Sequence, residues 1–333
     1  MTENVMPWPA GARAVTSQLR SDGTLRHLIT LEDLPRLILE RLLERSQRFV
    51  RPLGTPPPLS QSLAGHTVAN LFTEPSTRTR VSFELAAKRL GADVVNLEVQ
   101  LSSRVKGESM LDTVYTLQAM HVDAMVIRDA EAGVPASVAA NVAPHVSVLS
   151  AGEAHVSHPT QGLLDALTVQ QHKKRLEGLS IAIVGDVRHS RVARSDYHVF
   201  RALGCSDLRI VAPPALMPPP EEFAGCSRHT SLKSGLKDAD VVMMLRIQKE
   251  RMGQADLPDA DRYFAKYGLT PERLAGAKPG AIVMHPQPMN RGIEIASDVA
   301  DGPQSVIRDQ VRNGVAVRMA VLEEVLTTAA GQA

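Results

Sequence analysis

The chain has 333 residues, with 37 Lys and Arg against 36 Asp and Glu, so its formal net charge is +1. The length indicates about two domains, and 44% hydrophobic with 22% charged residues is ordinary globular composition, which argues against wholesale disorder. Near-neutrality argues against a general nucleic-acid or anionic-membrane binder, but it leaves room for a local basic pocket.

Membrane and metal signals are missing from the sequence pattern. The most apolar long segment, residues 132–152, is interrupted by prolines and polar residues, so we expect no membrane span. The first residues lack the basic start and apolar core of a signal peptide. Cys205 and Cys226 are 21 residues apart and belong to no His/Cys cluster, so we expect reduced, buried thiols, no metal site and a cytoplasmic protein.

The chain begins with two segments of different character. Residues 1–26 combine prolines and glycines with little periodicity, and we expect them to form an N-terminal extension. Apolar residues between Leu28 and Leu43 then recur at helical spacing, and Asp33-Leu34-Pro35 lies close to the expected helix start. The Pro-rich stretch 52–62 must be a loop.

Short apolar runs then alternate with helical segments. The runs predict strands at 67–72, 94–97, 124–127, 146–149, 180–184, 208–212, 241–245 and 281–284. The segments between and after them predict helices at 79–90, 110–120, 135–141, 160–176, 191–203 and 314–327. This alternation implies right-handed βαβ units and parallel sheets. We therefore expect an α/β fold of two domains, each with a parallel sheet flanked by helices, joined near residue 160.

Hydroxyl and arginine side chains crowd the segment 74–80, which follows a predicted strand and opens a predicted helix. The free backbone N–H groups of a helix start favour an anion. Ser76, Thr77 and Thr79 add hydroxyl donors, and the planar cation of Arg78 can fork onto phosphate oxygens. An N-cap with surface arginines would need fewer of these groups, so we favour an oxyanion site. The chain has no nucleotide P-loop.

His158 directly precedes Pro159 at a predicted helix start. There the positive end of the helix dipole disfavours protonation of the imidazole. A neutral histidine can donate a hydrogen bond to a carbonyl without acting as a base, but a helix-capping role is the commoner alternative for such a residue taken alone.

Polar segments follow three strands of the second half, at 185–191, 245–251 and 285–291. Ligands of open parallel sheets bind at the carboxyl ends of strands, so arginines there favour recognition of ligand carboxylates over solvated surface charge. A dinucleotide site is the competing interpretation. It lacks its glycine fingerprint, because Asp186 and Val187 follow Gly185.

Four ordered motifs carry a family resemblance: Ser-Thr-Arg-Thr-Arg at 76–80, His-Pro-Thr-Gln at 158–161, Arg-x-Gln-x-Glu-Arg at 246–251 and His-Pro-x-Pro at 285–288. Together they resemble the aspartate/ornithine carbamoyltransferases, and within them the aspartate-specific catalytic chains, over residues 28–326. The resemblance implies an active site in the cleft between a carbamoyl phosphate-binding domain (27–158 plus 314–333) and an aspartate-binding domain (159–313). It also implies transfer of the carbamoyl group of carbamoyl phosphate to the α-amine of L-aspartate, in pyrimidine biosynthesis, without a cofactor or metal.

The resemblance also implies residue roles. Carbamoyl phosphate would be held by Ser76, Thr77, Arg78, Thr79, Arg128, His158, Gln161, Pro286, Gln287 and Pro288. Among these, the catalytic set would be Arg78, Thr79, Arg128 and His158, the last three polarising the carbonyl oxygen. Aspartate would be bound by Lys106, Arg191, Arg246 and Gln248. Ser102 and Lys106 would reach the site of a neighbouring subunit in a homotrimer, and interdomain ties would come from Glu74, Arg191 and Arg251.

Some features depart from the family pattern or leave alternatives. Gln287 stands where Leu or Gly is expected, and its side chain could crowd the carbamoyl amide or bond to it. Arg246 and Gln248 suit a dicarboxylate better than ornithine, but another amine substrate, or a catalytically silent scaffold subunit, remain competing hypotheses; a nicotinamide-dependent dehydrogenase is a weaker one. Residues 1–26 motivate the hypothesis of assembly with a dihydroorotase-like or regulatory partner. Neither a nucleic acid nor a membrane is expected as a partner.

Overall fold

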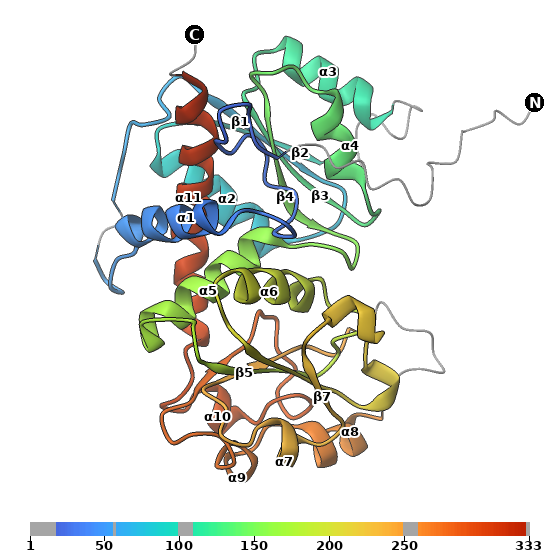
Figure 1. The fold of residues 1–333 in the computed structure, drawn as a ribbon. Helices are drawn as coiled ribbons and strands as arrows, with labels where there is room; N and C mark the ends of the chain where they lie inside the picture. The colour runs from blue at the N-terminus through green and yellow to red at the C-terminus, as the bar shows by residue number, and fades with distance from the viewer. Residues whose placement is uncertain (1–17, 56–57, 99–108, 249–258, 331–333) are drawn as a thin grey trace, which may run out of the picture.

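The computed structural model describes residues 18–55, 58–98, 109–248 and 259–330 (Figure 1). Two sheets lie one above the other in this view, with helices around and between them. The first residues described already belong to the folded body: Leu25 is fully buried, and the side chain of Gln18 accepts hydrogen bonds from the backbone N–H groups of Ile29 and Thr30.

The first sheet has four parallel strands: β1 (Thr67–Phe72), β2 (Asp93–Glu98), β3 (Ala124–Asp129) and β4 (Ser147–Glu153). Their order across the sheet is β2-β1-β3-β4, so the chain leaves β1 in one direction and returns on its other side to form β3.

Strands β1, β3 and β4 are buried on both faces, which explains their nearly continuous apolar sequences, whereas the edge strand β2 is largely exposed. In β1, Val68 and Phe72 face a core shared with α1 (Arg36–Phe49), α2 (Thr77–Arg89) and α11 (Ile307–Ala330). Ala69 and Leu71 point the other way, into a second core with α3 (Met110–Ala119) and α4 (Val134–Asn141).

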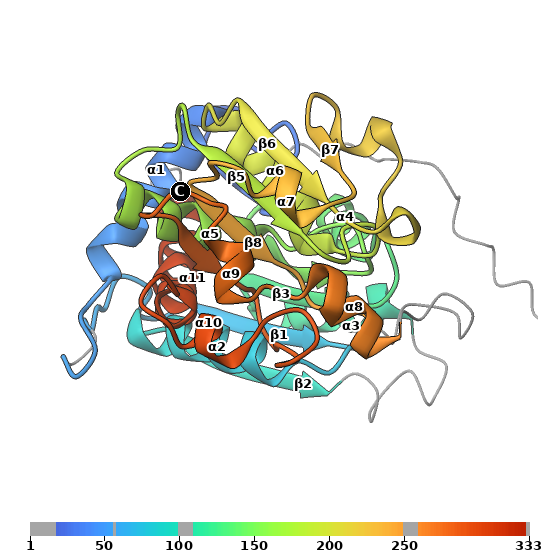
Figure 2. The same cartoon turned by 90° about the horizontal axis from the view of Figure 1, so that it is seen from below.

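The second sheet has five parallel strands: β5 (Ser180–Val184), β6 (Asp207–Val211), β7 (Ser227–His229), β8 (Val241–Met244) and β9 (Ile282–Met284). They lie in the order β7-β6-β5-β8-β9. Short helices surround the sheet: α6 (Arg191–Ala202), α7 (Leu232–Gly235), α8 (Ala260–Tyr267), α9 (Pro271–Leu274) and α10 (Ser297–Ala300). Figure 2 shows α8, α9 and α10 at the end of the molecule that faces away from the first sheet.

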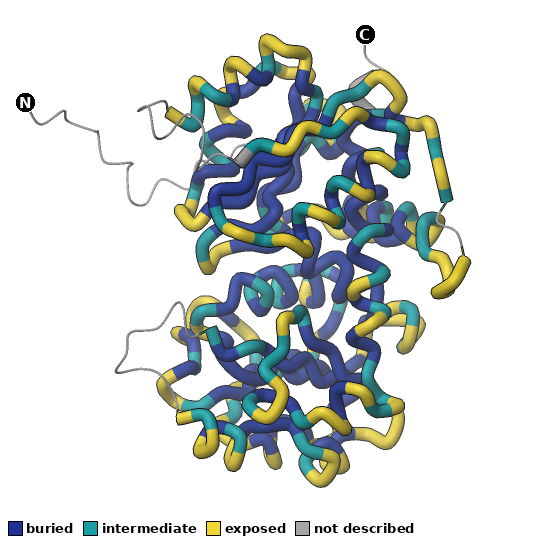
Figure 3. Tube along the Cα trace, turned by 180° about the vertical axis from the view of Figure 1, so that it is seen from behind, coloured by how far each residue is buried: buried dark blue, intermediate teal, exposed yellow. Residues whose placement is uncertain are grey.

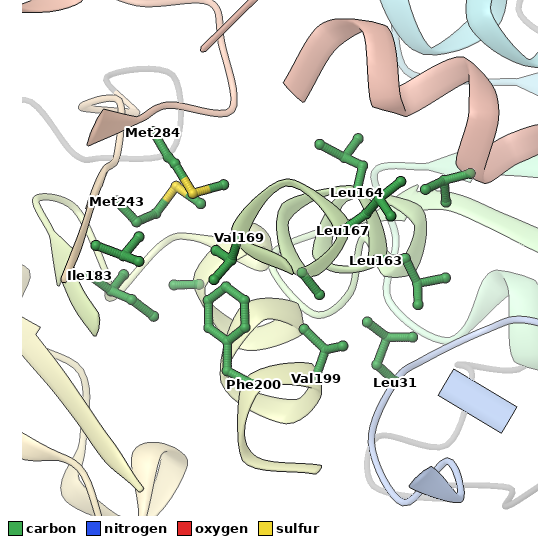
Figure 4. Packing of buried hydrophobic residues seen from close by; sticks show 14 of the residues in the cluster. Leu31, Leu163, Leu164, Leu167, Val169, Ile183, Val199, Phe200, Met243 and Met284 are labelled. Carbon is green, nitrogen blue, oxygen red and sulfur yellow. The ribbon is translucent and has the colours of Figure 1, made fainter. Parts of the chain in front are cut away.

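Two helices connect the halves. Helix α5 (Pro159–Lys173) lies between the sheets and packs against α6, α11 and β4. Val169 of α5 lies next to Phe200 of α6, and Met243 and Met284 of the second sheet lie further along the same cluster (Figure 4). Helix α11 runs beside both halves (Figure 1) and packs on α1 and α2. Buried residues accordingly lie in the interior of both halves and in the region that joins them (Figure 3).

The crossing of α5 and α6 depends on a glycine. A Cβ atom placed on Gly162 would lie 2.7 Å from Cδ1 of Leu31 and 3.0 Å from the carbonyl oxygen of Ser195 in α6. Only a residue without a side chain lets the two helices approach so closely.

The expected α/β fold with two parallel, helix-flanked sheets is confirmed. The first helix begins at Arg36, directly after the expected start near Asp33-Leu34-Pro35, but Leu28, which was counted in its periodicity, lies outside it and bridges to Leu149 beside the first sheet. Helix α11 begins at Ile307, seven residues before its predicted start, and β7 was not predicted. Both cysteines are free, but Cys226 is only partly buried. No helix in the described ranges is long and apolar enough to cross a bilayer.

Candidate active site

The order of the strands places the candidate residues. In an open parallel sheet, a crevice forms at the point where the strand order reverses, because the loops after the two neighbouring strands lead to opposite sides of the sheet. The first sheet has this switch between β1 and β3, which are followed by the loop 73–76 and by the end of β3 at Arg128. The second sheet has it between β5 and β8, which lead to Asp186 and to Arg246.

The two crevices open into one cavity of about 720 Å³. All predicted site residues in the described ranges line it: Glu74, Ser76, Thr77, Arg78, Thr79, Arg128, His158, Gln161, Arg191, Arg246, Gln248, Pro286, Gln287 and Pro288. Predicted residues Ser102, Lys106 and Arg251 lie outside the described residues. Among the described residues, the lining holds five arginines, the fifth being Arg318, against one carboxylate, that of Glu74, so this part of the pocket is strongly positive in a chain of net charge +1.

The start of α2 forms one wall. Ser76 is its N-cap residue, yet its side chain makes no capping hydrogen bond. Thr77, Arg78 and Thr79 form the first turn, in which Arg78 is exposed and Thr79 is buried. The unpaired N–H groups of a helix start, joined by three hydroxyls and a guanidinium, are donors suited to phosphate oxygens.

Glu74 links the two halves of the molecule at the cavity. Its carboxylate accepts hydrogen bonds from Nη2 of Arg128 in β3 at 2.9 Å and from Nη1 of Arg191 in α6 at 3.0 Å. Burial opposes its ionisation, but the hydrogen bonds and charges of Arg191 and Arg128 outweigh burial and lower the pKa of Glu74. Gly152 leaves room for both guanidinium groups, because a Cβ there would lie 3.3 Å from each.

The start of α5 brings two buried side chains to the opposite wall. His158 is its N-cap residue, and its backbone N–H donates to Oγ of Ser195 at 2.9 Å. Gln161 lies in the first turn, and its Nε2 donates to both carboxylate oxygens of Asp165, at 3.2 and 3.1 Å. Pro159 at the first helical position needs no hydrogen-bond acceptor, which favours a helix that starts here.

A buried carboxylate braces the loop after β8. Oδ2 of Asp186 accepts the backbone N–H of Gln248 at 3.2 Å, and its Oδ1 lies 2.8 Å from Nδ1 of His189. Nε2 of Gln248 donates to the carbonyl of His189 at 3.1 Å. These contacts tie the loops after β5 and β8 to each other, so Arg246 is presented from a fixed backbone.

A histidine shapes the loop after β9. The backbone N–H of Gln287 donates to Nδ1 of His285 at 2.9 Å, so Nε2 carries the ring proton and donates to the buried Glu294 at 3.3 Å. This bond bends the chain at Gln287, whose φ of 56° lies in the left-handed region that non-glycine residues rarely adopt. The backbone of residues 286–288 is thereby turned toward the cavity.

Arg318, which reaches the cavity from α11, belongs to none of the sequence motifs. Its guanidinium lies 5.1 Å from the ring centroid of Phe83, and Nη1 donates to the carbonyl of Gly314 at 2.8 Å. No carboxylate in the described part of the chain pairs with it. Burial, followed by the charge of Arg128, lowers the pKa of Arg318 to about 10, so it stays a cation at neutral pH.

The arrangement can bind an anion and stabilise a developing oxyanion from several sides. Arg128, Thr79 and His158 converge from different elements on the cavity between the halves. Among the described residues, no cluster of three or more His, Cys, Asp or Glu side chains could hold a metal ion. The donors on the cavity walls support positioning of polar substrates together with charge stabilisation.

Comparisons with known proteins agree with this geometry. Residues 26–171 match the family model of the aspartate/ornithine carbamoyltransferase carbamoyl-P binding domain, and residues 177–325 match that of the Asp/Orn binding domain. Aspartate transcarbamoylase from Trypanosoma cruzi, in complex with carbamoyl aspartate and phosphate, is 31% identical with a TM-score of 0.80, over 90% of this chain and 96% of that one.

The same enzyme in complex with N-(phosphonacetyl)-L-aspartic acid is 32% identical, with a TM-score of 0.80 over 90% and 96% of the two chains. Ornithine carbamoyltransferase from Pyrococcus furiosus is 28% identical, with a TM-score of 0.79 over 90% and 97%. Overall shape therefore does not separate the two substrate classes. From its two matched domains, its parallel sheets and its shared cavity, this chain belongs to the aspartate/ornithine carbamoyltransferase family.

Proposed function

We propose that this protein is an aspartate carbamoyltransferase, which transfers the carbamoyl group of carbamoyl phosphate to the α-amine of L-aspartate. The observation that carries the proposal is one cavity with two kinds of anion donor on its walls. The start of α2 offers Ser76, Thr77 and Arg78 for a phosphate, while Arg246 and Gln248 come from the second sheet. Such a pair of sites fits a phosphorylated donor and a dicarboxylate acceptor.

On the donor side, Ser76, Thr77, Arg78 and Thr79 hold the phosphate. Arg128 spans from the phosphate to the carbonyl oxygen, where Thr79 and His158 also donate. Gln161 and the backbone of residues 286–288 bind the carbamoyl amide. All of these groups line the same cavity, which supports the assignment.

On the acceptor side, the choice of aspartate over ornithine depends on charge. Arg191, Arg246 and Gln248 offer cationic and neutral groups to the acceptor, and Glu74 is the only carboxylate among the described lining residues. Glu74 is already engaged by Arg128 and Arg191. A second ammonium, as in ornithine, would therefore lie among cations, whereas the two carboxylates of aspartate are matched.

The chemistry then follows from positioning and charge. The amine nitrogen attacks the carbonyl carbon, and a C–N bond forms in a tetrahedral intermediate whose oxygen carries the negative charge. Arg128, Thr79 and His158 stabilise that oxygen. The C–O bond to phosphate breaks, and the leaving phosphate accepts the proton from the amine. No side chain is needed as a nucleophile.

The test is a direct assay of the purified protein with carbamoyl phosphate and either aspartate or ornithine. Carbamoyl aspartate with aspartate alone is the expected result. Product with ornithine alone, or with neither amine, contradicts the proposal.

We also propose a homotrimer, as the family resemblance implies, with Ser102 and Lys106 of each chain completing a neighbour's site. If sites are shared, an Arg78→Ala chain and a Lys106→Ala chain, each inactive alone, regain activity after joint unfolding and refolding. Mixed trimers then contain some sites with neither substitution. Failure to regain activity in verified mixed trimers contradicts shared sites.

Three further assignments are proposals of the same kind. The division into domains 27–158 plus 314–333 and 159–313 is supported by the packing of α11 on α1 and α2 of the first half. Two free thiols support a reducing compartment such as the cytoplasm. Assembly with a dihydroorotase-like or regulatory partner rests on the N-terminal segment alone, and co-elution of the two purified proteins would test it.

A further inference from the structure

Two carboxyl groups face each other in the contact between α5 and α6, just behind the cavity. Asp165 and Asp196 are both fully buried. No lysine or arginine in the described ranges pairs with either of them. Two adjacent buried carboxyls cannot both ionise, so the pair shares a proton.

The proton belongs to Asp196. Both of its carboxyl oxygens lack a hydrogen-bond donor in the described structure, whereas Asp165 receives donors from two other side chains. Burial, and next the nearby Asp165, raise the pKa of Asp196 well above its ordinary value. Burial also raises the pKa of Asp165, to about 7, but hydrogen bonds from Gln310, Gln161 and Asp196 oppose that shift. Asp196 is therefore the donor of the pair and Asp165 the acceptor.

Because the Asp165 carboxylate only accepts hydrogen bonds, it determines the orientation of the glutamine side-chain amides next to it. Nε2 of Gln310, from α11, donates to Oδ1 of Asp165 at 2.7 Å, and Oε1 of Gln310 accepts the backbone N–H of His285 at 2.8 Å. A backbone N–H can only donate, so both contacts of Gln310 require the same orientation of its amide.

Gln161 is turned by the same acceptor. Its Nε2 is committed to Asp165, at 3.2 and 3.1 Å. Its Oε1 has no hydrogen-bond partner among the described residues, and the side chain lines the cavity. The group that Gln161 offers to a substrate is therefore a carbonyl oxygen, which accepts hydrogen bonds and does not donate them.

We propose that Asp165 is a positioning residue that locks the Gln161 amide with its oxygen toward the substrate, and so selects a transferable group that carries an N–H donor. This inference rests on the proposed function, and it explains how the site distinguishes a carbamoyl group from an acyl group. Acetyl phosphate has a methyl group where carbamoyl phosphate has NH₂, and it would leave the oxygen of Gln161 unpaired. Sites that hydrogen-bond a substrate group reject analogues that lack it.

The experiment measures kcat/KM for carbamoyl phosphate with aspartate, and the inhibition constant of acetyl phosphate against carbamoyl phosphate. Asp165→Leu removes the acceptor, so Gln161 can turn its NH₂ toward the substrate. We expect kcat/KM for carbamoyl phosphate to fall about tenfold, the size of one lost hydrogen bond, with little change in the inhibition constant of acetyl phosphate or in KM for aspartate. Gln161→Met should give the same selective loss, and combining the two should add nothing.

Two matched variants separate positioning from general destabilisation. Thr168→Val, also in α5, removes an equivalent buried acceptor for a side-chain amide of α11, that of Asn313 at 2.8 Å, without touching Gln161. We expect its substrate selectivity to equal that of the wild type. Asp165→Asn keeps an acceptor oxygen, and its NH₂ can donate to Asp196, so it should keep most of the selectivity.

Each outcome bears on the inference. Should Asp165→Leu not fold, Asp165→Asn and Gln161→Met carry the test. The positioning role is overturned if Gln161→Met weakens the inhibition by acetyl phosphate as much as it lowers kcat/KM for carbamoyl phosphate. It is also overturned if Asp165→Asn loses the preference for carbamoyl phosphate over acetyl phosphate. If the wild type transfers no carbamoyl group at all, the proposed function fails first and this inference falls with it. If the wild type turns over normally but Gln161→Met weakens carbamoyl phosphate and acetyl phosphate equally, this inference alone is overturned.

Discussion

Arg78 is the most exposed cation of the donor-side wall, at the start of α2. Because it makes no ion pair within the described structure, removing it should leave the fold almost unchanged. We expect Arg78→Ala to lower kcat about 10²- to 10³-fold, as when a transition-state donor is lost, and to change the free energy of unfolding by at most about 0.5 kcal/mol. Steady-state kinetics and denaturant unfolding check the two parts, with Arg80→Ala of the same helix as the control. Normal turnover in a folded Arg78→Ala protein would contradict the phosphate assignment.

Single residues were predictable from sequence where a local motif carries them. The segment 74–80 has its donors within a few residues, so it was singled out directly. Arg318, Gln310 and Asp165 were not, because each lies in a helix whose local pattern is ordinary. They meet the site only through the packing of α5 and α11, and no spacing within either helix encodes that contact.

At the level of elements, the α5–α6 crossing can be tested at Gly162. Alanine normally favours a helix by about 1 kcal/mol over glycine, but its Cβ would lie 3.0 Å from a backbone oxygen of α6. Overpacking of this kind costs about 1–3 kcal/mol, so we expect Gly162→Ala to lower the free energy of unfolding overall. Gly280→Ala is the control, because a Cβ there meets open space. Equal stability of the two variants in guanidinium unfolding would contradict the tight crossing.

The elements that sequence located best were strands buried on both faces. Residues 67–72 and 180–184 were predicted with the bounds that the structure has, because a short, continuous apolar run is typical of a central strand in a parallel sheet. β7 was missed because Ser227–His229 is a short edge strand of polar residues without alternation. The helical pattern before α1 was misleading, because Leu28 and Leu31 are buried without being helical, so their spacing resembles that of a helix.

At the scale of the whole molecule, Glu74 ties the two halves through Arg128 and Arg191. Its pKa is lowered from an ordinary value of 4.5, so the tie contributes stability above about pH 4.5 and loses it as the pH falls through the lower, folded-state pKa. We expect the acid loss of stability to be shallower in Glu74→Gln than in the wild type, as measured by denaturant unfolding between about pH 3 and 7. Parallel acid limbs in the two proteins would show that the tie does not contribute.

The family resemblance implied that the site lies between two α/β halves, and three polar segments after strands of the second half predicted a ligand at the carboxyl ends of those strands. What it did not contain was the strand order. The switch points between β1 and β3 and between β5 and β8 bring the loops after these strands next to each other. The positions of the switch points depend on long-range pairing of strands.

The central claim is that one cavity binds a phosphate and a dicarboxylate at the same time. N-(phosphonacetyl)-L-aspartic acid joins a phosphonate to the two carboxylates of aspartate, so its binding by calorimetry tests both walls at once. We expect tight binding to the wild type and a loss of at least about tenfold in both Arg78→Ala and Arg246→Ala, since each removes a charged hydrogen bond from a different wall. Undiminished binding in either folded variant would contradict the account.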